Sequence, residues 1–61
     1  MYFDSIIIPD DYVGLVIGKK GNTIRKIEIK YGVKILIDNN NFYLYTTGKQ
    51  DQLVKTKNSL Y

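Results

Sequence analysis

The sequence predicts an α+β domain with the element order β-α-α-β-β-α, in which three helices cover one face of a three-stranded antiparallel sheet. Three observations lead to this prediction: a β-branched run that stops at a proline, two short amphipathic segments joined by a glycine-bounded turn, and an alternating pattern that continues through an asparagine-rich turn. The 61 residues are the size of one small domain, which we expect to span residues 1–61. Because there is no Cys, apolar packing must stabilise the fold.

The first strand and the first helix are expected on either side of Pro9. A strand is predicted over about residues 5–9, because β-branched side chains favour strands and a proline cannot donate a ladder hydrogen bond; the β-branched residues are Ile6, Ile7 and Ile8. Asp10 is a candidate N-cap for a helix over residues 11–17, where apolar side chains recur at helical spacing. We expect this helix to end at Gly18.

A second helix is expected after a loop at residues 18–21. It is predicted over residues 22–31, because Ile24 and Ile27 share one helical face while the basic side chains lie largely on others. Gly32 is expected to end the helix in the left-handed backbone region, which glycine adopts without a steric penalty.

A hairpin and a third helix complete the pattern. Alternating apolar and polar residues predict a strand over residues 33–38 with one buried face. Residues 38–41 are predicted to turn, because Asp and Asn tolerate positive φ, and a strand over 42–47 follows. A helix is predicted over about residues 49–60, with one apolar face formed by Leu53, Val54, Leu60 and Tyr61.

Positive charge is concentrated in one part of the chain. Residues 18–34 carry six Lys and Arg against the single acid Glu28, a net charge of +5, whereas the rest of the chain has a net charge of −2 and the whole chain +3. This distribution is typical of proteins that bind nucleic acid. An ordinary solvated helix face is the alternative interpretation.

Several function classes are excluded or disfavoured. Without His or Cys, there is no zinc site, thiolate nucleophile or usual neutral-pH general base, and we expect neither a metal nor a cofactor. Nucleotide hydrolysis is disfavoured because the stretch from Gly14 to Lys19 is one residue too short for a P-loop. Helix capping explains the adjacent carboxylates of Asp10 and Asp11 better than catalysis does. We therefore expect no enzymatic activity.

The sequence also carries an expectation about location. No apolar run approaches the roughly eighteen residues that a membrane span needs, and the N-terminus lacks the pattern of a signal peptide. We therefore expect no membrane partner and an intracellular protein, located in the cytoplasm, or in the nucleus if the organism is a eukaryote.

The loop at residues 18–21, Gly-Lys-Lys-Gly, is the main candidate for function. Glycines at both ends allow positive φ and let a sugar-phosphate backbone approach without meeting a Cβ. The following helix would present its free N–H groups and positive dipole end beside the loop, which favours an anion. Lys19 and Lys20 add positive charge at the tip, and a solvated loop tip is the alternative interpretation.

This stretch and its surroundings resemble the core of a K homology (KH) domain over most of the chain. The matching residues are Ile8-Pro9, Val13-Gly14, Ile17-Gly18-Lys19-Lys20-Gly21, Ile24, Ile27 and Gly32-Val33-Lys34-Ile35-Leu36-Ile37. A strand and a helix follow the second strand, which is the type I arrangement. The resemblance implies that the G-x-x-G loop clamps about four nucleotides of single-stranded RNA, with single-stranded DNA as an alternative ligand, while the bases lie in an adjacent apolar groove.

Carried over residue by residue, the resemblance implies a specific set of binding residues. The loop would be formed by Gly18, Lys19, Lys20 and Gly21. The groove floor would draw on Val13, Gly14, Ile17, Ile24, Ile35 and Ile37. Ile24 and Ile27 are also candidates for plain core residues. Arg25 is a further candidate, although the helix phase leaves open whether its side chain faces the groove.

Two features depart from common members of the family. The loop at residues 38–41 is short, similar to that of the KH domain in polynucleotide phosphorylases and in archaeal ribosome-assembly KH proteins. Glu28 occupies a helix position where some members carry Arg toward a base. A carboxylate accepts hydrogen bonds where Arg donates them, so base preference cannot be transferred from those members.

The open face of the sheet suggests an alternative function. If Phe42, Leu44 and Thr46 face the helices, an apolar patch formed by Ile7, Leu36, Tyr43 and Tyr45 faces outward. Such a patch fits a homodimer, a partner domain or a tolerated exposed surface. The alternative to RNA binding is therefore a protein-interaction or scaffold module in an RNA-processing or ribosome-assembly complex, with little RNA affinity of its own.

Overall fold

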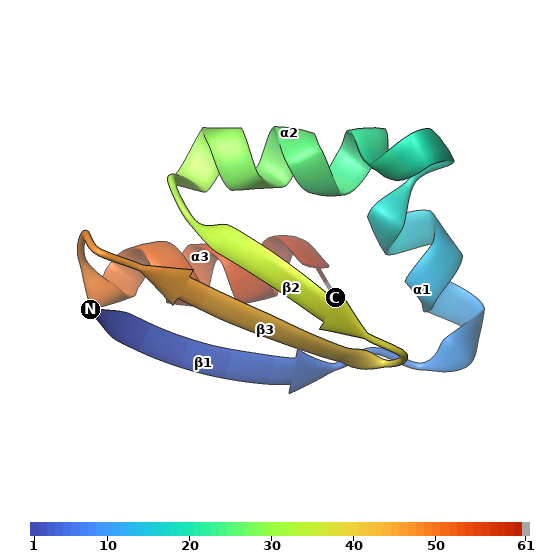
Figure 1. Cartoon of the computed structure of the whole chain (residues 1–61), viewed down its shortest axis with the longest axis horizontal. Helices are drawn as coiled ribbons and strands as arrows, with labels where there is room; N and C mark the ends of the chain where they lie inside the picture. Colours follow the sequence, from blue (N-terminus) through green and yellow to red (C-terminus); the bar gives the residue numbers. More distant parts are fainter. Residues whose placement is uncertain (61) are drawn as a thin grey trace.

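A computed structural model of the chain describes residues 1–60 and confirms the predicted α+β fold. The elements are β1 (Tyr2–Ile7), α1 (Asp10–Ile17), a 3₁₀ turn η1 (Lys19–Gly21), α2 (Asn22–Tyr31), β2 (Lys34–Asp38), β3 (Asn41–Thr46) and α3 (Gln50–Leu60). The three strands form one antiparallel sheet in the order β1-β3-β2. The helices lie on one side of this sheet (Figure 1). None of the helices within residues 1–60 is long and apolar enough to cross a membrane.

The central strand β3 supplies the middle of the core. Phe42 and Leu44 are fully buried, and they are paired in register with Ile37 and Ile35 of β2. Side chains of paired residues in an antiparallel sheet lie on the same face, so these positions all point toward the helices. The buried apolar cluster consists of Ile8, Val16, Ile24, Val33, Ile35, Phe42, Leu44, Leu53 and Leu60.

The third helix closes the core with a face that differs in part from the predicted one. Leu53, Thr56 and Leu60 are buried, whereas the side chain of Val54 is 52% exposed. The prediction that Val54 lies on the buried face was therefore wrong. Thr56 is buried instead, and its hydroxyl donates to the Gln52 carbonyl. Tyr61, which was assigned to the same face, lies outside the described residues.

The first strand begins earlier than expected and the first helix is capped differently. β1 starts at Tyr2 rather than near residue 5, and it ends at Ile7. Pro9 occupies the N-cap position of α1, and Asp10 is the first helical residue, so the prediction of Asp10 as N-cap was wrong. The carboxylate of Asp10 instead accepts a hydrogen bond from the amide of Asn40, which also donates to the Ile8 carbonyl at 2.8 Å.

The hairpin and its flanking glycine form as predicted, with small shifts of bounds. Asp38 pairs with Asn41 across a two-residue turn, in which Asn39 has φ of 56°. The strands therefore run over Lys34–Asp38 and Asn41–Thr46 rather than residues 33–38 and 42–47. Gly32 ends α2 in the left-handed region, with φ of 65°.

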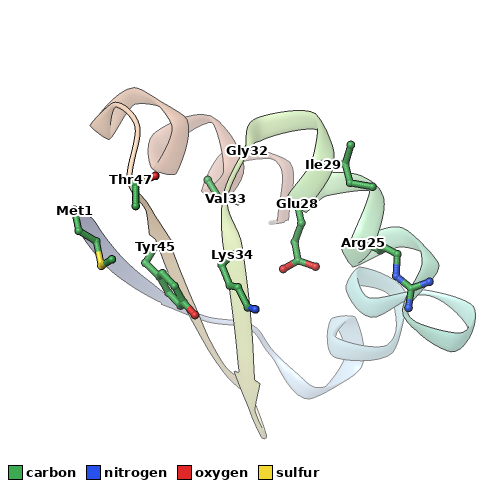
Figure 2. A pocket seen from close by; sticks show the side chains of 9 residues that line it. All are labelled: Met1, Arg25, Glu28, Ile29, Gly32, Val33, Lys34, Tyr45 and Thr47. Carbon is green, nitrogen blue, oxygen red and sulfur yellow. The ribbon is translucent and has the colours of Figure 1, made fainter.

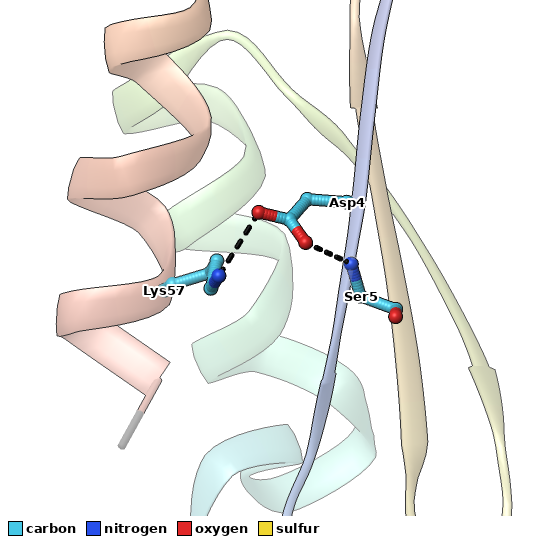
Figure 3. A network of polar contacts seen from close by, with 3 residues as sticks. All are labelled: Asp4, Ser5 and Lys57. Carbon is cyan, nitrogen blue, oxygen red and sulfur yellow. Dashed lines mark hydrogen bonds and ion pairs between the residues drawn. The ribbon is translucent and has the colours of Figure 1, made fainter.

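One ion pair joins the sheet to the last helix. Lys57 Nζ of α3 donates to Asp4 Oδ2 of β1 at 2.9 Å, and the Ser5 N–H donates to the other carboxylate oxygen at 2.7 Å (Figure 3). Asp4 has the same parity as Ile6 along the strand, so it points toward the helices, and Lys57 provides the opposite charge at that position. The pair holds the N-terminal strand against the helix at the end of the chain.

Candidate nucleic-acid interface

The Gly-Lys-Lys-Gly loop reverses the chain between α1 and α2 through three residues with positive φ, Gly18, Lys20 and Gly21. Gly18 ends α1 with φ of 76° and ψ of 175°, a region that only glycine adopts readily, and its N–H donates to the Gly14 carbonyl at 2.9 Å. Lys20 and Gly21 follow in the left-handed region, with φ of 54° and 75°. The loop is therefore a tight turn with a defined backbone conformation.

The two glycines of the loop face different surroundings. A Cβ on Gly18 would stand 2.8 Å from the backbone nitrogen of Thr23 and even nearer to its side-chain hydroxyl. A Cβ on Gly21 would meet only Ile24, at 4.0 Å. Gly18 is thus required for packing against the first turn of α2, whereas Gly21 leaves open space above the loop.

The charges at the loop are exposed and available. Lys19 and Lys20 are both exposed, and neither forms an ion pair within residues 1–60. No side chain caps the start of α2, which follows directly at Asn22. Two cations and uncapped helical N–H groups therefore lie at the same place, an arrangement that favours a phosphate.

The expected groove residues separate into two groups. Ile24 and Ile35 belong to the buried core, being 9% and 8% exposed, and Val13 and Ile17 are half-buried against that core. Gly14 is exposed, with nothing within 4 Å of an added Cβ, and Ile37 is 39% exposed. Of the expected groove residues, Gly14 and Ile37 are therefore exposed, Val13 and Ile17 are exposed in part, and their role in binding stays a prediction.

A concave pocket of about 480 Å³ lies between α2 and the neighbouring ends of β2 and β3. Arg25 is part of its lining, but none of the other expected groove residues is, so a place for Arg25 in the groove stays a prediction. The full lining is Met1, Arg25, Glu28, Ile29, Gly32, Val33, Lys34, Tyr45 and Thr47 (Figure 2). A second pocket of similar volume lies between the helices and is lined by Tyr12, Leu15, Val16, Thr23, Ile27, Ser59 and Leu60.

Sequence reasoning did not include Ile29, Lys34 and Tyr45 in the candidate site. Ile29 is 77% exposed although it is a large apolar residue, and it lies one helical turn after Arg25. That spacing from Arg25 is the signal in the sequence that could have identified it. Tyr45 was assigned to the open sheet face, and the sequence carries no signal that its ring also lines a pocket beside α2.

The open sheet face has the expected apolar character and one further member. Ile7 and Leu36 are exposed, while Tyr43 is half-buried. Phe3 lies on the same face, and its ring stacks on that of Tyr43 with centroids 6.2 Å apart. The predicted strand began too late to include Phe3, although it has the same strand parity as Ile7.

The sequence model of the KH domain family matches residues 4–60. The KH domain-containing protein MJ0443 of Methanocaldococcus jannaschii is 50% identical over 44 residues, which are 70% of this chain and 19% of that protein.

Two solved structures from Pyrococcus horikoshii OT3 share the fold. Dim2p superposes with a TM-score of 0.86 at 27% identity, covering 93% of this chain and 37% of that chain. A chain of the a/eIF2alpha-aDim2p-rRNA complex superposes with a TM-score of 0.83 at 28% identity, covering 92% of this chain and 34% of that chain. This chain therefore spans well under two thirds of the length of each of these relatives. From the family match and the observed β-α-α-β-β-α order, the chain belongs to the KH domain family, in its type I arrangement.

Proposed function

We propose that this chain binds about four nucleotides of single-stranded RNA, with the RNA backbone on the Gly-Lys-Lys-Gly loop and the bases on the adjacent apolar surface. The observation that carries the proposal is the loop itself, in which Lys19 and Lys20 are exposed and unpaired beside the uncapped start of α2. A phosphate at this position would meet two cations beside the start of α2, whose N–H groups no side chain caps.

The comparisons support RNA as the ligand class. KH domains are an RNA-binding family without a catalytic role, and the family match covers almost the whole chain. One similar fold comes from a complex that contains rRNA. Within residues 1–60, no group of three or more His, Cys, Asp or Glu side chains is arranged to hold a metal ion. The proposed activity is binding, with no reaction at the site.

A double charge reversal at the loop tests the proposal. Lys19→Asp/Lys20→Asp should weaken binding of single-stranded RNA at low salt by at least about tenfold, because phosphate contacts dominate affinity. Asp tolerates the positive φ of Lys20, so the fold should persist, which circular dichroism would check. The matched control is Lys49→Asp/Lys55→Asp, which makes the same change in net charge at exposed positions outside the loop and pocket. Equal loss of affinity in both variants would contradict a role for the loop.

A comparison of binding affinities tests whether the ligand is RNA or single-stranded DNA. Oligonucleotides of the same sequence with ribose or deoxyribose differ at the 2′-hydroxyl, which is the group that lets a protein distinguish the two. We expect tighter binding of the RNA form. Equal affinities would extend the proposal to single-stranded nucleic acid in general.

A protein-interaction function is the second candidate, because the open sheet face is apolar. Phe3 is 66% exposed and Ile7 72% exposed, on the face opposite to the helices. A homodimer or a partner domain would cover these side chains. Analytical ultracentrifugation over a concentration series tests the homodimer, and a monomer at all concentrations would remove it.

A further inference from the structure

The second pocket, of about 480 Å³ between the three helices, has an apolar and partly open lining, and we call it the helical pocket. Leu15 of α1 lines it and is 71% exposed, although its side chain is large and apolar. Ile27 of α2 and Leu60 of α3 line the same pocket and are half-buried and buried. Exposed apolar side chains around a concave surface are typical of places where another molecule binds.

The helical pocket and the expected RNA groove lie on opposite faces of α1. Consecutive residues of an α-helix are about 100° apart around its axis. Tyr12 and Leu15, which line the helical pocket, therefore share one face of α1. Gly14 and Ile17, which are expected in the groove, share the opposite face. A molecule in the helical pocket therefore need not displace RNA from the groove.

Two cations from different helices meet at one end of the helical pocket. Ser59 of α3 lines the pocket, and its hydroxyl forms a hydrogen bond of 2.6 Å with the Tyr31 hydroxyl of α2. Lys30 Nζ lies 5.4 Å from the centre of the Tyr31 ring. The hydrogen bond with Ser59 lowers the pKa of Tyr31 below its ordinary value of 10.0. The positive charges of Lys30 and Lys55 also lower this pKa, so both ammonium groups lie near the Tyr31 hydroxyl.

This group of side chains is able to receive an anion. Lys30 and Lys55 are both exposed, and neither forms an ion pair within residues 1–60. The bond between the hydroxyls of Tyr31 and Ser59 uses only one of their two hydrogens, so the other can be donated to an incoming group. A carboxylate at this place would therefore meet two positive charges and a hydroxyl donor.

We propose that the helical pocket binds an acidic peptide segment of a partner protein, with an apolar side chain in the pocket and a carboxylate beside Lys30 and Lys55. Charge complementarity favours this partner, because the two cations attract an acidic segment and repel a basic one. The lining contains no glycine at which a sugar-phosphate backbone could approach closely, which favours a peptide over a nucleic acid. This partner is additional to the proposed RNA binding and does not depend on it.

Selection from a peptide library tests the proposal without assuming a sequence. Phage that display short random peptides are selected on the immobilised chain, and the enriched peptides are synthesised. We expect these peptides to combine Asp or Glu with Leu, Ile or Phe, and to shift the NMR amide signals of Leu15, Ile27 and Ser59. The proposal is overturned if no peptide is enriched, if the enriched peptides lack acidic residues, or if the shifts lie on the open sheet face around Phe3 and Tyr43.

Leu15→Ser tests the apolar part of the proposal. Because a buried anchor carries much of the affinity at such contacts, this change should weaken binding of an enriched peptide by about tenfold. Val54→Ser is the matched control, since Val54 is an exposed apolar residue of α3 that does not line the helical pocket. Thermal unfolding verifies the fold of both variants. Equal affinities of the two variants for the peptide would show that Leu15 is not part of the site.

Lys30→Glu/Lys55→Glu tests the charged part. It should weaken binding of the acidic peptide by about tenfold or more, and a peptide with Lys in place of its acidic residues should bind this variant better than it binds the wild type. Lys34→Glu/Lys49→Glu makes the same change in net charge at exposed positions that do not line the helical pocket. The same loss and the same rescue in this control would reduce the effect to net charge and overturn the proposal.

A parallel titration with randomised tetranucleotide RNA separates this proposal from the proposed function. RNA that shifts residues 18–21, together with no enriched peptide, overturns the peptide site alone. Enriched peptides at the helical pocket, together with no RNA binding, overturn the proposed function alone. If RNA rather than any peptide shifts the amides of Leu15, Ile27 and Ser59, the pocket is part of a nucleic-acid interface and the peptide site is overturned.

Discussion

Gly18 packs directly against Thr23, so that a Cβ on the glycine would stand 2.8 Å from the backbone nitrogen of Thr23. This contact lies where the chain passes from α1 to α2, so it constrains the angle between the two helices. It ties the shape of the proposed phosphate loop to the packing of the fold, because the same residue has a backbone conformation that other residues avoid.

Gly18→Ala should therefore destabilise the protein. Backbone strain and overpacking against Thr23 together should cost about 3 kcal/mol of unfolding free energy. Gly21→Ala is the matched control, because it has a similar φ of 75° but no close contact, and it should cost only about 1 kcal/mol. Urea denaturation measures both values. Equal losses would show that the contact with Thr23 does not constrain the loop.

Gly14→Ala should raise stability and lower RNA affinity together. Gly14 lies inside α1 with nothing within 4 Å of an added Cβ, and Ala in a helix interior is favoured over Gly by about 0.5–1 kcal/mol. The added methyl group would project into the surface that we propose to hold bases. Thermal unfolding and RNA titration of the same preparation measure the two effects. A variant that is more stable and binds RNA with unchanged affinity would remove Gly14 from the interface.

Ile24→Asn should unfold or strongly destabilise the domain. Ile24 is 9% exposed within the core, and an amide there would be buried without a partner, at a cost of about 3 kcal/mol or more. Ile29→Asn is the control on the same helix, since Ile29 is 77% exposed and should tolerate the change within about 0.5 kcal/mol. Comparable thermal midpoints for the two variants would mean that the core is misassigned.

The ion pair between Asp4 and Lys57 should make stability depend on pH in the acid range. The hydrogen bond from Lys57, with that from the Ser5 N–H, lowers the pKa of Asp4 below its ordinary value of 3.8. A carboxyl with a lowered folded-state pKa contributes stability that is complete above its unfolded pKa and lost as the pH falls through the folded one. Both side chains are more than a third exposed, so the contribution should stay below about 1 kcal/mol.

Asp4→Asn measures that contribution. Below about pH 4, the wild type should lose more of its thermal stability than the variant does, because only the wild type has a carboxylate to protonate at this position. Parallel stability curves from pH 7 to pH 3 would show that the ion pair contributes nothing measurable.

Short-range patterns were sufficient to predict the order of the elements. The glycines at positions 18 and 32 end the two helices as expected, and the asparagine turn forms the hairpin, because each depends on backbone preferences of the residues themselves. The alternation in β2 likewise predicted a buried Ile35, since one face of an edge strand that packs on helices must be apolar.

Long-range contacts account for what the sequence did not predict. The polar residue Asp4 interrupts the apolar alternation of β1, and its partner Lys57 lies 53 residues away, so the start of the strand was missed. Asp10 was predicted to cap the helix from its local sequence. Its actual hydrogen-bond partner, Asn40, lies 30 residues away, where no local pattern indicates it. The contact between Glu28 and the backbone of Ile35 depends on the register of the sheet, which no local pattern specifies.

The central claim is that the Gly-Lys-Lys-Gly loop and the adjoining surface bind single-stranded RNA, and an NMR titration tests it most directly. Isotope-labelled protein is titrated with randomised tetranucleotide RNA, and each backbone amide reports binding at its own position. We predict that the amides of residues 18–21 show the largest chemical-shift changes, together with those of Gly14 and Ile37. Spectra that stay unchanged at large excess of RNA, or shifts confined to the open sheet face around Phe3 and Tyr43, would contradict the account.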